Sequence, residues 1–74
     1  MGVPQRGKVE RFDKEVGLGE LRAVDARLYP FHCTEIADGS RDIAVGADVT
    51  FVVAAGHKGR WEARQLEVDG APAR

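Results

Sequence analysis

The feature that most constrains this chain is a period-two alternation of apolar and polar residues. The clearest case is residues 47–54, where Val49, Phe51 and Val53 share one face. This period is typical of β-strands with one buried face. Four further short segments suit strands, at residues 7–13, 17–24, 27–33 and 60–68. No segment has a convincing helical period, so we expect no helix longer than one or two turns.

Two irregularities are expected in these strands. Pro30 lacks the N–H group that a sheet ladder needs, so its strand should lie at an edge or contain a bulge. In the last segment, Trp61 and Ala63 share one parity, whereas Leu66 and Val68 share the other. A face that changes parity within a strand indicates a β-bulge between the two pairs.

Turn-forming residues at 37–40 and 56–59 separate the predicted strands. Five short strands in so short a chain predict a small all-β sandwich or antiparallel barrel, and a barrel also protects its edges. We expect an N-terminal extension at 1–6, one domain at 7–68 and a tail at 69–74. The predicted core includes Val9, Leu21, Phe31, Val49 and Phe51.

Composition limits the function of the chain. Seventy-four residues form a single domain with a thin core. Eleven basic residues face twelve acidic ones, so any face that binds nucleic acid must arise from local segregation of charge. The single cysteine, Cys33, excludes an internal disulfide. There is no apolar run of membrane-spanning length and no apolar signal core near the N-terminus, so we expect a cytoplasmic protein.

The order of motifs resembles a known family. Residues 7–13 read GKVERFD, 16–21 read VGLGEL, 29–36 read YPFHCTEI and 45–51 read VGADVTF. This order is similar to that of a divergent bacterial cold-shock domain protein, and the resemblance covers residues 7–68. It implies a five-stranded antiparallel barrel of the OB type that binds single-stranded RNA or DNA. In such a barrel, the glycines of VGLGEL allow a coiled strand to bend and another group to approach closely.

The family binds bases by stacking them on aromatic side chains, and most of these rings are replaced here. The replacing residues are Arg11, Leu18, Glu20, Pro30 and Cys33, while Phe12 and His32 remain. A stacked base contributes about 1–3 kcal/mol, so the resemblance implies weak affinity. Glu20 also sets a carboxylate where a base and its phosphate would approach.

The first hypothesis is a small single-stranded nucleic-acid-binding protein of low sequence specificity, acting as an RNA chaperone or as a regulator of transcription or translation. Cations would meet phosphates, whereas the rings and Leu18 would meet bases. The candidate contact residues are Lys8, Arg11, Phe12, Leu18, His32, Lys58, Arg60 and Trp61. Contacts between cations and phosphates must then supply the binding energy that base stacking does not, so binding should depend strongly on salt.

The second hypothesis is a protein-interaction module on the same barrel. Its basis is the near-neutral net charge, the loss of stacking rings and an apolar line through Leu18, Pro30 and Trp61. A structural observation separates the two hypotheses. A continuous basic face formed by the cations Lys8, Arg11, Arg22, Lys58 and Arg60 favours nucleic acid, and acidic residues that interrupt this face favour a protein partner.

Other residues carry weaker alternatives. Trp61 is either a stacking surface or a cap on the barrel end, and the tendency of tryptophan to be largely buried favours the cap. His32 and Cys33 are neighbours on a strand, so they point to opposite faces and do not converge on one metal ion. Cys33 is best interpreted as a small core hydrophobe. We expect no cofactor, no metal and no enzymatic activity.

Overall fold

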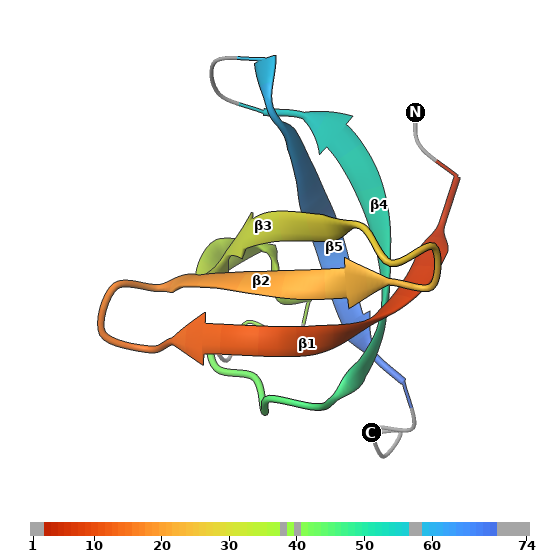
Figure 1. The fold of residues 1–74 in the computed structure, drawn as a ribbon. Helices are drawn as coiled ribbons and strands as arrows, with labels where there is room; N and C mark the ends of the chain where they lie inside the picture. The colour runs from red at the N-terminus through yellow and green to blue at the C-terminus, as the bar shows by residue number, and fades with distance from the viewer. Residues whose placement is uncertain (1–2, 38, 40, 57–58, 70–74) are drawn as a thin grey trace.

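The computed structural model describes residues 3–37, 39, 41–56 and 59–69. Within them the chain forms five antiparallel strands that curl into a small barrel (Figure 1). The strands are β1 (Gln5–Asp13), β2 (Leu18–Ala23), β3 (Leu28–His32), β4 (Asp48–Ala55) and β5 (Trp61–Val68), and a short 3-10 helix η1 (Cys33–Glu35) follows β3. No helix of the described residues has the length and apolar character needed to span a bilayer. The predicted all-β, OB-type fold is confirmed.

The strand order is β3-β2-β1-β4-β5, which leaves β3 and β5 at the two edges of the sheet. The sheet curls until these edges contact each other, and an isolated parallel bridge joins Ile36 to Leu66 beside them. Pro30 lies in β3, opposite Glu20 of β2, and therefore on an edge strand as predicted. An edge strand tolerates proline because one side of its backbone has no ladder partner.

Two bulges bend the sheet. In β1, Val9 pairs with Leu21 and Arg11 pairs with Glu20, so Glu10 is an extra residue. In β5, the extra residue lies between the partners of Thr50 and Val52, where Gln65 has a φ of 55°. This second bulge is the one that the parity change predicted. Bulges of this kind increase local twist and bend the strand, which allows five short strands to close around one core.

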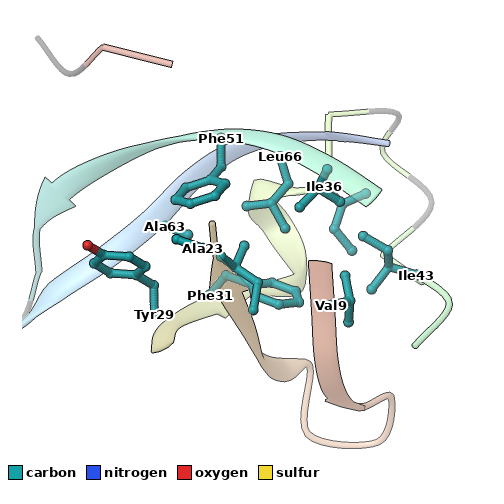
Figure 2. Close-up of a cluster of buried hydrophobic side chains, with 11 residues drawn as sticks. Val9, Ala23, Tyr29, Phe31, Ile36, Ile43, Phe51, Ala63 and Leu66 are labelled. Carbon is teal, nitrogen blue, oxygen red and sulfur yellow. The ribbon is translucent and has the colours of Figure 1, made fainter. Parts of the chain in front are cut away.

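The core lies between the two halves of the curled sheet (Figure 2). All five residues predicted to be buried are at most 1% exposed, which confirms the assigned register. The core residues are Val9, Leu21, Ala23, Tyr29, Phe31, Ile36, Ile43, Val49, Phe51, Ala63 and Leu66. Both Ala63 and Leu66 are buried, because the bulge between them returns the strand to the same face.

Gly19 lies at a close approach within the barrel. A Cβ atom there would lie 2.6 Å from Cζ of Phe31 and 2.8 Å from the carbonyl oxygen of Arg11. The rings of Phe12 and Phe31 stack over this position, with centroids 5.9 Å apart and an interplanar angle of 1°. Gly17 ends the preceding turn with a φ of 80°, a conformation that favours glycine. The two glycines thus serve a turn and a close approach.

Replacing Val49 tests the register. Val49 is fully buried, so Val49→Ala should lower the free energy of unfolding by about 1–3 kcal/mol through lost burial and a residual cavity. Urea denaturation measures the change. Val45→Ala is the matched control, because Val45 is 63% exposed and should show almost no change. Equal stability of the Val49→Ala variant and the wild type would contradict the assigned core.

Candidate nucleic-acid interface

The outward face of β1, β2 and β3 is the surface that the sequence analysis proposed for binding. Residues directly opposite each other on paired strands present their side chains on the same face. The register therefore sets three rows on this outward face: His32, Leu18 and Asp13; then Pro30, Glu20 and Arg11; then Leu28, Arg22 and Lys8. The only aromatic ring in these rows is the imidazole of His32.

Acidic residues interrupt the basic side chains of the outward face. Nε of Arg11 lies 3.1 Å from Oε1 of Glu20, its partner across the strands. Two similar pairs are Arg22 with Glu10 at 3.4 Å and Lys8 with Asp48 at 3.5 Å. Such exposed pairs contribute little to stability, but each places a negative charge where a phosphate would approach. The face is therefore not continuously basic.

The candidate cations thus fall into two groups. Lys8 and Arg11 are ion-paired, whereas Arg60 makes no ion pair with any described residue. Arg60 follows Gly59 in the connection between β4 and β5, and its carbonyl oxygen accepts a hydrogen bond from the N–H group of Gly56. Lys58 lies outside the described residues. Among the described candidates, Arg60 is the cation that is available to a ligand.

Trp61 is 61% exposed, so the expectation that it caps the barrel end is wrong. It pairs with Ala55 at the last rung of the β4–β5 ladder. The β4–β5 hairpin projects beyond β1, β2 and β3 (Figure 1), which agrees with the exposure of the indole. The ring is therefore available as a stacking surface.

Trp61 lines a groove between the two edges of the sheet, which we call the Trp61 groove. The residues that line it are Glu20, Arg27, Leu28, Tyr29, Pro30, Arg60 and Trp61. Strand β3 supplies one wall, and the start of β5 supplies the other. The groove therefore joins apolar surface, one exposed aromatic ring and two arginines.

The remaining candidate residues lie apart from this groove. Leu18 and His32 are cross-strand partners and form an exposed pair where β2 begins and β3 ends. Phe12 is half-buried and stacks on Phe31, so it lies on the core side of β1. Cys33 begins η1 and does not continue β3, so the expectation that it lies on a strand beside His32 is wrong. Its side chain is half-buried and packs against the core, as suits a small hydrophobe. No set of three or more metal-ligating side chains gathers in the part of the chain that the structure describes.

Sequence reasoning missed Arg27, Leu28 and Tyr29 as residues of the site. Leu28 has the same strand parity as Pro30, and this signal could have placed it on the outer surface. Tyr29 belongs to the core and is 7% exposed, yet it also lines the Trp61 groove. No local pattern indicates that Arg27 and Arg60 face one groove, because this proximity depends on how far the sheet curls.

The comparisons with known proteins support this fold. A solved structure from Drosophila, "drosophila Unr CSD456", is similar to this chain with a TM-score of 0.75 and 25% sequence identity. The similarity covers 97% of this chain and 30% of that chain, so this chain spans about a third of the length of its structural neighbour. No family model and no curated protein matches the sequence. The neighbour is a cold-shock domain structure, and the chain accordingly has a cold-shock-like OB fold, a fold generally used to bind nucleic acid.

Proposed function

We propose that this protein binds single-stranded RNA or DNA weakly, with low sequence specificity and strong dependence on salt. The observation that carries the proposal is the exposed ring of Trp61 beside the unpaired cation Arg60, on a cold-shock-like barrel. Aromatic stacking tolerates any base, and arginine recognises phosphate regardless of sequence. A protein with these contacts acts as an RNA chaperone or as a regulator of transcription or translation.

Weak affinity is part of the proposal because the outward face offers few contacts. Its only aromatic ring is His32. Its cations Arg11, Arg22 and Lys8 are paired with the carboxylates of Glu20, Glu10 and Asp48. A phosphate that approaches this face therefore meets carboxylates as well as ammonium and guanidinium groups. Binding must then rest on a small number of phosphate contacts and a small number of stacked bases.

The ion pairs also favour a second candidate function, a protein-interaction module. Interrupted basic charge was the criterion for this alternative, and Arg11 paired with Glu20 at the centre of the face meets it. Leu18 and Leu28 are exposed on the outward face, and Trp61 is exposed in the groove that Leu28 also lines. These apolar side chains would be the contact surface for a partner.

The salt dependence of the affinity distinguishes weak electrostatic binding from binding that rests mainly on stacking. With two or three phosphate contacts, the affinity for a short oligothymidine should fall about 5–20-fold between about 50 and 200 mM salt, at a slope near −0.7 per contact. Fluorescence anisotropy of a labelled oligomer measures this change. Strong binding that is flat with salt would contradict the proposal, because it would require more stacking than these side chains supply.

Glu20 is the residue whose replacement should improve binding. Glu20→Phe removes the carboxylate and adds a ring to the outward face, so the affinity for oligothymidine should rise by about 1–3 kcal/mol if a base stacks on the ring. Glu20→Gln is the matched control, because it releases Arg11 without adding a ring. Anisotropy titrations of both variants, with circular dichroism to verify the fold, provide the test. No gain for either variant would favour the protein-interaction module.

A further inference from the structure

The Trp61 groove shares Glu20, Leu28 and Pro30 with the outward face but differs from the rest of that face in charge. On the outward face, the cations are paired with acids and the centre is occupied by Glu20 and Arg11 at 3.1 Å. The Trp61 groove contains two arginines, and the charge of its only acidic residue, Glu20, is already balanced by Arg11. The groove is therefore the more favourable place for an anion.

Trp61 differs from the other large aromatic residues of this chain in its exposure. The others are Phe12, Tyr29, Phe31 and Phe51. Tyr29, Phe31 and Phe51 are buried, and Phe12 is half-buried against Phe31. Trp61 thus offers the one large aromatic face that a flat ligand can cover, and Leu28 and Pro30 line the same groove from β3.

The Tyr29 hydroxyl adds a polar group to this apolar site. The Tyr29 side chain is 7% exposed, and its ring is held by a tilted contact with Phe51 at 5.8 Å. Figure 2 shows the hydroxyl at the end of the core cluster, pointing away from the other labelled side chains. Among the described residues the hydroxyl makes no hydrogen bond, and no buried side-chain polar atom lacks a partner, so this oxygen reaches the surface. A fixed hydroxyl of this kind can donate to or accept from the edge of a base.

We propose that the Trp61 groove, and not the part of the outward face around Arg11 and Leu18, holds one unpaired base of a single-stranded nucleic acid. The base stacks on Trp61, the Tyr29 hydroxyl bonds its edge, and Arg27 and Arg60 meet the flanking phosphates. Arg27 is available for this role because its Nε lies 3.8 Å from Asp25, a long and exposed pair. This inference rests on the proposed nucleic-acid binding. It places that binding in the Trp61 groove, with one base bound per protein molecule.

The groove can be probed without a label, because Trp61 is the only tryptophan. Oligothymidine should quench its fluorescence, and the quenching curve should give the same Kd as anisotropy of the labelled oligomer. An abasic oligomer of equal length has the same phosphates but no bases. It should bind about 5–100-fold more weakly, the equivalent of one lost stacked base.

Three variants separate the parts of the site. Trp61→Leu should weaken oligothymidine binding about 5–100-fold through the lost stack. Tyr29→Phe keeps the ring that packs on Phe51, removes only the hydroxyl and should weaken binding about 2–10-fold. Arg60→Gln should reduce the salt slope by about 0.7. Arg6→Gln is its control, because Arg6 is another exposed cation without an ion pair and lines a different groove.

The possible outcomes distinguish this inference from the proposed function. If oligothymidine binds by anisotropy but leaves Trp61 fluorescence unchanged, and Trp61→Leu binds equally well, the groove assignment is wrong and nucleic-acid binding stands. If oligothymidine does not bind at about 50 mM salt, where electrostatic binding is stronger than at physiological salt, both are wrong. If oligoglutamate quenches Trp61 and oligothymidine does not, the groove takes an acidic protein segment, which also overturns the inference.

Discussion

The structure depends on the absence of a side chain at Gly19. Phe12 and Phe31 stack across this position, and the carbonyl oxygen of Arg11 lies below the van der Waals distance for any added Cβ atom. Because side chains alternate along β2, a core-facing Gly19 forces Leu18 and Glu20 outward. The close packing around Gly19 therefore also determines which side chains a ligand meets on the outward face.

The two bulges extend this constraint to the rest of the barrel. They bend β1 and β5, so the edge strands β3 and β5 come together without a continuous ladder between them. The start of β5 projects past this junction (Figure 1) and carries Trp61 away from the core. A groove forms where the edges diverge. In this groove the exposed ring of Trp61 lies beside Arg60, which makes no ion pair with any described residue.

Local patterns predicted the fold well, because they report burial directly. The five core residues, the edge position of Pro30 and the bulge before Leu66 all followed from strand parity and from the missing N–H group of proline. The site was less predictable. Exposure of Trp61 depends on hairpin length relative to the barrel, and pairing of Arg11 with Glu20 depends on register across strands, which the sequence alone does not show.

The most direct test of nucleic-acid binding at the Trp61 groove is a heteronuclear NMR titration of the labelled protein with short oligothymidine at low salt. The account predicts that the indole N–H resonance of Trp61 and the amide resonances of Leu28 and Tyr29 shift most. The amides of Arg11 and Leu18, which lie on the outward face but do not line the groove, should shift little. Shifts concentrated at Arg11 and Leu18, or no shifts at all, would contradict it.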